Sequence, residues 1–534
     1  MRFLLFLFLS LVLSAQGLHA QSPKYEVRAV WLATIGGIDW PHSYYASAQR
    51  EELRQMLDRL KEAGINTVLF QARVRATTVY PSALEPWDGC VSGTPGRSPG
   101  YDPMQLCIDL CHERGMECHA WVVTLPVGKW NATGCQQLRR QYPSLIRHIG
   151  EDGYMDPEMP QTAEYLARVC REIVRNYDVD GIHLDYIRYP ETWKLKVSRQ
   201  QGRENITRIV RAISQAVKGE KPWVKMSCSP VGKHDDLHRY RSGGWNARTA
   251  VCQDAQEWLR LGLMDQLYPM MYFRGNHFYP FAIDWQENAH GRTIAGGLGT
   301  YFLDPREGNW TADVVEREMH VLRQLGMGFC HFRAKFLCDN IKGVYDFTKR
   351  FCQTPALVPP MTWSGATPPQ QPQGLTLKGS VLSWTPTSTT YNLYASEDFP
   401  VDVSRAENIV ATKLHRCAVD LGKTGSRMNY AVTAMDRYGQ ESAPAQLLVN
   451  AGPAYAKPEI AITDGRPVRI PQLGYPYDAD FIIIETLLGK PVATRRYAPT
   501  ISVNGIPDGI YQLRTLGRKG RNHRIGFFSI KRKP

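Results

Sequence analysis

The feature that most constrains the fold is a regular alternation of short β-branched or aromatic runs with longer helical patterns, from Tyr25 to about Cys352. The helical segments carry apolar residues at i, i+3 and i+4, as amphipathic helices do. The eight predicted strands are Val27–Thr34, Thr67–Arg73, Glu117–Thr124, Gly181–Tyr186, Trp223–Ser229, Gln266–Tyr272, Thr293–Tyr301 and Gly328–Arg333. Eight such strands within about 330 residues predict an α/β fold, a (β/α)8 TIM-type barrel at residues 25–353.

A doubly wound open sheet is the competing fold. Such a sheet normally carries a glycine-rich phosphate-binding loop directly after its first strand. The segment at that place, Ile35–Pro41, reads IGGIDWP and contains no GxGxxG motif. The barrel is therefore favoured.

Composition divides the rest of the chain into three parts. Residues 354–373 are rich in Pro, Gln, Thr and Ser, which predicts an extended linker with few contacts across it. Residues 374–450 alternate like short strands, and Trp384 with Tyr430–Asp436 resembles a fibronectin type III module. Residues 451–534 are again β-like and hold 14 Lys or Arg against 6 Asp or Glu. We expect small β-sandwich domains there, with a basic C-terminal domain that favours an anionic partner.

The N-terminus predicts export. Arg2 precedes the apolar run Phe3–Val12, and Leu18-His19-Ala20 offers a cleavage site, so residues 1–20 read as a signal peptide. Cleavage after Gly17 is an alternative. Because no other segment approaches 18 apolar residues, we expect a periplasmic or cell-surface protein with no transmembrane segment.

The 12 cysteines do not follow a metal-binding pattern. The sequence contains neither a CxxC pair nor HExxH, so we predict no zinc site and no cofactor. Cys107, Cys111 and Cys118 are interpreted as small buried hydrophobes. Cys90 and Cys135 lie in loop-like segments and are the better candidates for a disulfide bond.

The chemistry of a barrel of this kind lies at the C-terminal ends of its strands. Strand four ends in the most distinctive motif of the chain, His183-Leu184-Asp185. His183 and Asp185 are two residues apart, so both point to the same side of the strand. Acid–base chemistry at such a place needs a proton donor and a second catalytic group. Asp185 is the predicted acid; Asp39, Asp304 and the Asp235-Asp236 pair are alternatives for the second group.

Six short motifs fall in order on successive predicted strands and loops. They are Arg28–Trp31, Asp39–Pro41, Phe70–Arg73, Asp180–Pro190, Gln253-Asp254 and Asp265–Tyr272. Together they resemble the glycosyl-hydrolase-like family 10, a bacterial barrel family distinct from the family-10 xylanases, over Glu26 to Phe351. The resemblance implies cleavage of bacterial cell-wall glycan strands. Many members carry two adjacent Asp at the end of strand four, and here the second position is Tyr186.

Further residues near the strand ends are candidates for substrate binding. They are His183, Arg188, Arg73, Trp121, Tyr186, Tyr272 and Trp40. Arg73 and Arg188 could instead pair with Asp185 and close the barrel mouth, and aromatic rings at these places either stack on sugars or fill the core. Tyr272 with an acid on strand four resembles substrate-assisted chitinase-like enzymes, in which the acetamido group of the sugar attacks.

The leading hypothesis is an exported glycoside hydrolase that acts on an amino-sugar polysaccharide, such as the glycan strands of peptidoglycan. The alternative is a non-catalytic carbohydrate- or wall-binding protein on a barrel with a degraded site, which Tyr186 favours. A nucleic-acid partner is disfavoured by export and by the absence of any nucleic-acid motif.

Overall fold

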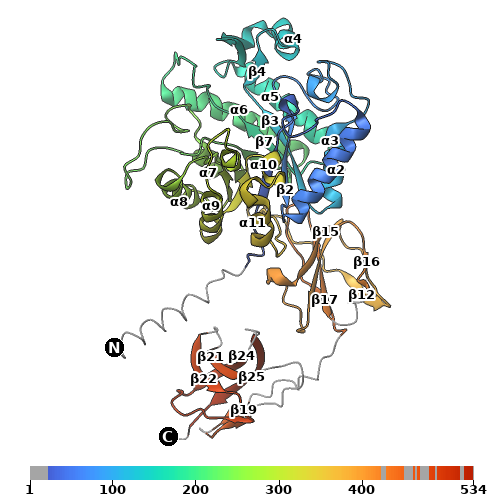
Figure 1. Ribbon diagram of the computed structural model, residues 1–534, viewed down its shortest axis with the longest axis vertical. Helices are drawn as coiled ribbons and strands as arrows, with labels where there is room; N and C mark the ends of the chain where they lie inside the picture. The colour runs from blue at the N-terminus through green and yellow to red at the C-terminus, as the bar shows by residue number, and fades with distance from the viewer. Residues whose placement is uncertain are drawn as a thin grey trace. The chain divides into compact units, whose positions relative to one another are not determined.

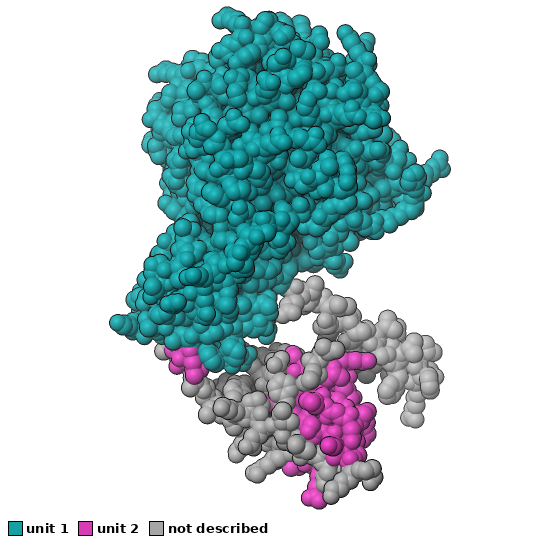
Figure 2. All heavy atoms as spheres, turned by 180° about the vertical axis from the view of Figure 1, so that it is seen from behind, with its two compact units in different colours: residues 1–447 teal, residues 448–534 magenta. Residues whose placement is uncertain are grey.

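The computed structural model describes residues 22–422, 428–449, 461–463, 466–469, 480–486, 490–516 and 522–532. The predicted signal peptide lies outside these residues. No helix in the described part of the chain is both long enough and apolar enough to cross a membrane. Contact analysis divides the chain into two compact units, residues 1–447 and 448–534 (Figure 2).

The first unit contains a closed barrel of eight parallel strands wrapped by helices (Figure 1), as the strand pattern predicted. Each strand pairs with its neighbours in chain order, and the last pairs with the first. The strands are β1 (Arg28–Leu32), β2 (Thr67–Arg73), β3 (Glu117–Val123), β7 (Gly181–Asp185), β8 (Lys225–Cys228), β9 (Gln266–Leu267), β10 (Thr293–Leu298) and β11 (Gly328–His331). Both faces of these strands are buried, which explains their nearly continuous apolar runs.

All eight predicted strands exist, and only β9 is much shorter than predicted. The expected strand was Gln266–Tyr272, and the observed one is Gln266–Leu267. Pro269 has no N–H to give to the ladder, so regular pairing stops there. The backbone still follows β8, because Tyr268 N donates to Cys228 O over 2.9 Å.

The helices lie on the outside of the barrel. They are α2 (Ala46–Glu62), α3 (Pro103–Glu113), α5 (Pro160–Asn176), α6 (Arg199–Glu220), α7 (Ala255–Arg260), α8 (Tyr279–Glu287), α9 (Ala312–Gln324), α10 (Ala334–Cys338) and α11 (Val344–Phe351). Helix α3 shows how local sequence sets such an element. Asp102 caps it by accepting hydrogen bonds from Met104 N and Gln105 N, with Pro103 in the first turn. Gly115, at φ +66°, ends the segment and lets β3 begin.

A small antiparallel sheet, which the sequence did not predict, is inserted after β3. It consists of β4 (Pro126–Lys129), β5 (Ile146–Ile149) and β6 (Asp152–Met155), with helix α4 (Thr133–Gln141) beside it. The insertion borders a cavity of about 50 Å³ that is also lined by Arg75 and Tyr186. Because Tyr186 directly follows β7, the insertion adds to the wall of the barrel mouth.

Two further sheets complete the first unit. One contains β12 (Gln373–Lys378), β13 (Val381–Thr385) and β16 (Ala418–Asp420). The other contains β14 (Thr390–Ser396), β15 (Ile409–Leu414), β17 (Asn429–Met435) and β18 (Ala445–Leu447). These sheets confirm that β modules follow the barrel. The sequence pattern predicts only five strands here, at Gly374–Leu377, Ser380–Trp384, Thr390–Ser396, Cys417–Asp420 and Asn429–Asp436. It misses β15 and β18.

The expectation of few contacts across residues 354–373 is wrong. Leu357 N donates to Lys24 O over 2.8 Å, and Leu357 itself is buried. Lys413 on β15 places its ammonium 2.8 Å from a carboxylate oxygen of Glu117 on β3. A side chain at Gly115 would lie 2.6 Å from Thr412 O, so the backbone of β15 also approaches the barrel closely. The four-stranded sheet therefore packs, through β15, against the N-terminal end of the barrel.

The second unit has its own core, and its described part is all β. It contains β19 (Ala461–Thr463), β20 (Val468–Arg469), β21 (Phe481–Thr486), β22 (Pro491–Arg496), β23 (Thr500–Ile501), β24 (Gly509–Leu516) and β25 (Asn522–Ile530). Five of these strands form one sheet in the order β19-β25-β24-β21-β22, and β20 pairs with β23. Ile482, Ile484, Leu513 and Phe528 form the centre of the core.

Candidate active site

Asp185 ends strand β7 at the C-terminal mouth of the barrel, and its side chain is held by three donors. Its Oδ1 accepts from Ser229 Oγ and from Tyr186 N, both over 2.8 Å. Its Oδ2 accepts from Trp121 Nε1 over 3.2 Å. Neighbouring strands supply these groups, since Trp121 lies on β3 and Ser229 directly follows β8. The carboxyl group is thus fixed in orientation, and Oδ2 keeps the larger free acceptor capacity.

No Lys or Arg of the described chain forms an ion pair with Asp185. Arg73, which could have closed the mouth on it, pairs with Glu85 over 2.6 Å. Arg188, the other candidate, pairs with Glu191 over 2.9 Å. Asp185 is 8% exposed, and burial raises its pKa above the usual value for an aspartate. The site therefore favours the protonated form, which suits a proton donor.

Arg73 does not reach the mouth. Its guanidinium is fully buried, donates to the main-chain oxygens of Val123 and Thr124, and forms a two-bond pair with Glu85. Tyr165 of α5 donates to the same Glu85 over 3.0 Å. This network fixes the ends of β2 and β3, so the structure gives Arg73 a positioning role and not a contact with substrate.

His183 lies below Asp185 in the barrel interior. Its Nε2 accepts from Trp31 Nε1 over 3.1 Å, so its Nδ1 carries the proton and faces Ser227 Oγ at 3.0 Å. The ring is fully buried, and burial lowers its pKa well below the usual value for histidine. His183 is a neutral, fully hydrogen-bonded residue of the barrel core, and its contact with substrate stays a prediction.

Asp39 and Trp40 are also engaged within the protein. Asp39 is fully buried, accepts from Ala33 N over 2.9 Å and pairs with Arg333. Trp40 is fully buried, and its Nε1 donates to Gln49 O over 2.9 Å. Neither side chain reaches solvent at the mouth.

The remaining predicted acids have cationic partners too. Asp304 binds Arg306 over 2.7 Å, and this hydrogen bond lowers the pKa of Asp304 to about 2. Asp235 pairs with Arg248 over 2.9 Å, and Asp236 is exposed. Within the described residues, none of these carboxylates is hydrogen-bonded to Asp185. Among the predicted acids, Asp185 is thus the buried one that forms no ion pair within the described residues.

Tyr272 lies beside this carboxyl group, in a cluster of aromatic rings. Its ring centroid lies 6.4 Å from that of Trp31, 5.6 Å from that of Tyr301 and 5.2 Å from that of Phe332. Its hydroxyl is buried and has no hydrogen-bond partner among the described residues. Burial, followed by smaller effects that include the nearby Asp185, raises the pKa of Tyr272 well above the usual value. The site therefore holds a neutral hydroxyl with no partner next to an acid.

A second aromatic group lies on the rim. Tyr186, at φ +52°, turns the chain sharply after β7. The Arg188 guanidinium lies 4.5 Å from the Tyr186 ring centroid and 5.1 Å from that of Trp245. Trp245 is 42% exposed, and sequence reasoning missed it together with Ser229 and Phe332. Ser229 ends a predicted strand, so the rule that functional groups lie at strand ends could have found it. Trp245 lies in a loop without a recognisable motif.

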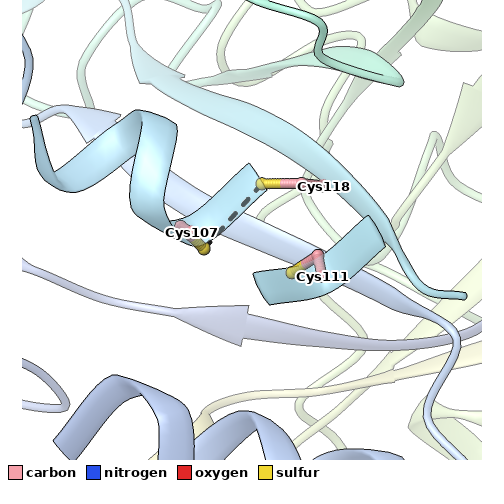
Figure 3. A group of neighbouring side chains, drawn as sticks. All are labelled: Cys107, Cys111 and Cys118. Atoms are coloured by element: carbon pink, nitrogen blue, oxygen red, sulfur yellow. Dashed lines mark hydrogen bonds between the residues drawn. The ribbon is translucent and has the colours of Figure 1, made fainter. Parts of the chain in front are cut away.

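The cysteines correct one prediction and reveal a cluster. Cys90 and Cys135 are both buried free thiols, so the predicted disulfide bond is absent. Cys107, Cys111 and Cys118 lie close together, with all three sulfur atoms within 4.8 Å of one another (Figure 3). The sequence rules missed this group, because its third member comes from a neighbouring strand.

Comparison with known proteins identifies the family of this chain. Residues 26–294 match the family described as Glycosyl hydrolase-like 10, and the chain belongs to this family. Glycosyl hydrolase YngK of Bacillus subtilis (strain 168) is 27% identical over 79% of this chain and 93% of that relative. Glycosyl hydrolase DigH of Escherichia coli (strain K12) is 30% identical over 47% of this chain and 67% of that relative. The chain is accordingly a glycoside hydrolase, and its substrate is a carbohydrate.

Among solved structures, the PgaB (BpsB) glycoside hydrolase domain from Bordetella bronchiseptica is similar, with 14% identity and a TM-score of 0.43. The match covers 61% of this chain and 98% of that domain. The glycoside hydrolase domain of PelA from Pseudomonas aeruginosa matches with 13% identity and a TM-score of 0.34, over 59% of this chain and 96% of that domain.

Proposed function

We propose that this chain is an exported hydrolase of a bacterial cell-wall polysaccharide, or of a related amino-sugar polymer, in which Asp185 is the general acid. The observation that carries the proposal is a buried carboxyl group at the barrel mouth that has three hydrogen-bond donors and no cation. A general acid needs a raised pKa, and burial shifts the pKa of Asp185 in that direction.

The three donors suit both states of this acid. Oδ1 is occupied by Ser229 Oγ and the main-chain N–H of Tyr186, so the proton belongs on Oδ2, which faces the leaving glycosidic oxygen. Once the proton has been transferred, the same donors and Trp121 stabilise the carboxylate. Orientation by neighbouring strands keeps the group in place during the reaction.

The second catalytic group is the acetamido group of the sugar itself. Asp39 and Asp304 each carry a cationic partner, which argues against either as a free nucleophile. Tyr272 instead offers a buried hydroxyl that has no partner among the described residues and lies within electrostatic reach of Asp185, and we infer that it donates to the acetamido oxygen as it attacks. This route needs an N-acetylated sugar, so it supports an amino-sugar polymer such as the glycan strands of peptidoglycan.

The other parts of the chain fit an enzyme that acts outside the cytoplasm. The leader-like segment at residues 1–20 directs export, and the basic residues after 451 favour an anionic surface such as a cell wall. The three-stranded and four-stranded sheets after the barrel support a fibronectin type III-like module at residues 374–450. The rings of Trp121, Tyr186 and Trp245 offer stacking surfaces for sugar residues along the mouth.

Asp185→Asn is the decisive variant, because it is nearly isosteric and removes the transferable proton. With purified peptidoglycan glycan strands as substrate, we expect kcat to fall by about 10²–10⁴-fold or more. Asp304→Asn is the matched control, since Asp304 is paired on a neighbouring loop, and it should keep near-native turnover. New reducing ends counted by mass spectrometry give the readout. Full activity in a folded Asp185→Asn protein would refute the assignment.

The alternative, a non-catalytic wall-binding protein, rests on Tyr186 at the place of a second acid. It predicts that the native protein binds glycan strands and releases no product. It also predicts that Asp185→Asn binds as the native protein does. Chemically de-N-acetylated glycan strands distinguish the acetamido mechanism from hydrolysis with a nucleophile of the protein. Only the acetamido mechanism loses its nucleophile on that substrate.

A further inference from the structure

Three cysteine side chains converge between helix α3 and strand β3, on the outer layer of the barrel (Figure 3). Cys107 and Cys111 are four residues apart on α3, so they lie on the same face of that helix. Cys118 is the second residue of β3. Side chains alternate along a strand, so Cys118 points outward toward the helix while His119 points into the barrel. The fold, and not the sequence spacing, brings the three thiols together.

The geometry of the group fits a metal ion. The Cys107 and Cys118 sulfur atoms lie 3.9 Å apart, and all three sulfur atoms lie within 4.8 Å of one another. Around an ion with three bonds to sulfur of about 2.3 Å each, neighbouring sulfur atoms lie about 4 Å apart.

The composition of the group selects the ion. All three side chains are fully buried, and their sulfur atoms are the only His, Cys, Asp or Glu donors in the group among the described residues. The adjacent imidazole of His112 is not free, because its Nε2 lies 2.9 Å from an Asp180 oxygen. Zinc sites normally have four ligands, whereas an all-sulfur set favours a soft ion such as Cu(I).

We propose that Cys107, Cys111 and Cys118 form a three-coordinate site for a soft monovalent d¹⁰ cation, with Cu(I) as its representative. The ion displaces thiol protons, which are released to solvent, and joins the last turns of α3 to β3 without any change in oxidation state. That last turn of α3 borders a solvent-open groove of about 940 Å³, lined in part by His112 and Glu113, which offers a route for the ion.

The site is separate from the catalytic one. Val123, at the other end of β3, pairs with Asp185, and Cys118 lies five residues before it. Five strand residues span about 16 Å. Metal binding is therefore expected to change the stability of the α3–β3 contact and to leave the hydrolytic site as it is.

The test uses the full-length protein, reduced and kept free of oxygen, titrated with Cu(I) against bicinchoninate as a competing chelator. We expect one Cu(I) per chain, a thiolate-to-metal absorption band in the ultraviolet, and three sulfur neighbours at about 2.3 Å by X-ray absorption. Cys111→Ser and Cys118→Ser should each weaken binding by at least about 100-fold, because even outer-shell changes cost about 10–100-fold. Cys170→Ser, which alters a separate buried thiol on α5, is the matched control and should bind as the native protein does.

Three results would overturn the proposal. The first is that native protein, shown to be folded by its circular dichroism spectrum, does not bind Cu(I) stoichiometrically. The second is undiminished binding in folded Cys111→Ser and Cys118→Ser, with Cys107→Ser as the replacement if either fails to fold. The third is a Zn(II) complex of higher affinity at the same thiols, which would replace the monovalent ion by a divalent one.

Discussion

A buried carboxyl group lies at each end of the barrel, and the pKa values of the two groups are shifted in opposite directions. At the N-terminal end, Glu117 of β3 accepts from Lys225 over 2.9 Å and from Lys413 over 2.8 Å, with His119 at 3.0 Å. At the C-terminal end, Asp185 of β7 has three neutral donors and no cation within ion-pair distance. The pKa of Glu117 is held well below the usual value, mainly by Lys225 and Lys413 acting against the desolvation that burial imposes, whereas burial raises the pKa of Asp185.

The two carboxyl groups have different roles: Glu117 stabilises the fold, and Asp185 belongs to the proposed active site. The carboxylate at the base is charged at neutral pH, and one of its partners, Lys413, comes from a strand 296 residues away. The ion pair between Glu117 and Lys413 thus joins the four-stranded sheet to the barrel. Burial raises the pKa of the Asp185 carboxyl group at the mouth, at the expense of stability, because no Lys or Arg of the described residues forms an ion pair with its charged form. The difference lies in the partners that each site receives and not in burial, since both groups are almost completely buried.

The largest effect on stability is expected at the base. Glu117→Gln leaves Lys225 and Lys413 close together without their shared anion, and should lower the free energy of unfolding by about 3 kcal/mol at pH 7. The folded pKa of Glu117 is depressed, so its contribution is present above about pH 4.3 and is lost as the pH falls through the folded value. The deficit of the variant should shrink accordingly in acid.

Chemical unfolding of the native protein and the variant between pH 3 and pH 8 measures this effect. Glu151→Gln is the control, because Glu151 is an exposed partner of Lys129 and should cost less than about 1 kcal/mol. Equal stability of Glu117→Gln and native protein at pH 7 would contradict the role given to the base.

A smaller effect of opposite sign is expected at the mouth. Asp185→Asn, the variant that we expect to lose activity, should raise the free energy of unfolding by about 1 kcal/mol at pH 8. The folded pKa of Asp185 is raised, so native stability is full below about pH 3.9 and falls as the pH rises through the folded value. The gain should disappear at pH 3. A variant that is less stable than native protein at pH 8 would show that the Asp185 carboxylate supports the fold.

The smallest effect on stability is expected for Tyr272→Phe. Its hydroxyl has no partner among the described residues, so its removal should change the free energy of unfolding by less than about 0.5 kcal/mol. The same change should lower kcat about 10²-fold, because a donor to the attacking acetamido oxygen is lost. Tyr268→Phe is the contrasting control, since its buried hydroxyl donates to Gln266 over 2.9 Å and its loss should cost about 1 kcal/mol. Native kcat in Tyr272→Phe would exclude Tyr272 from the reaction.

The amino-acid sequence by itself determined the barrel, and it led to a prediction of where the chemistry lies. Strands buried on both faces need continuous apolar runs, so the eight strands could be found from their pattern. The rule that catalytic groups follow strand ends then singled out Asp185. Where a strand such as β9 was too long in the prediction, a proline had interrupted the ladder.

Only the tertiary structure decided which polar groups have partners. Asp39 follows a predicted strand as Asp185 does, yet in the fold it pairs with Arg333, a residue 294 positions away in the sequence. Lys413, on a strand that the pattern did not predict, forms an ion pair with Glu117. Cys118 lies close to Cys107 and Cys111 in the fold, although the spacing of the three in the sequence matches no metal-binding motif. Hydrophobic periodicity is local and survives in the sequence, whereas charge pairing and thiol clustering depend on distances between segments that meet only after folding.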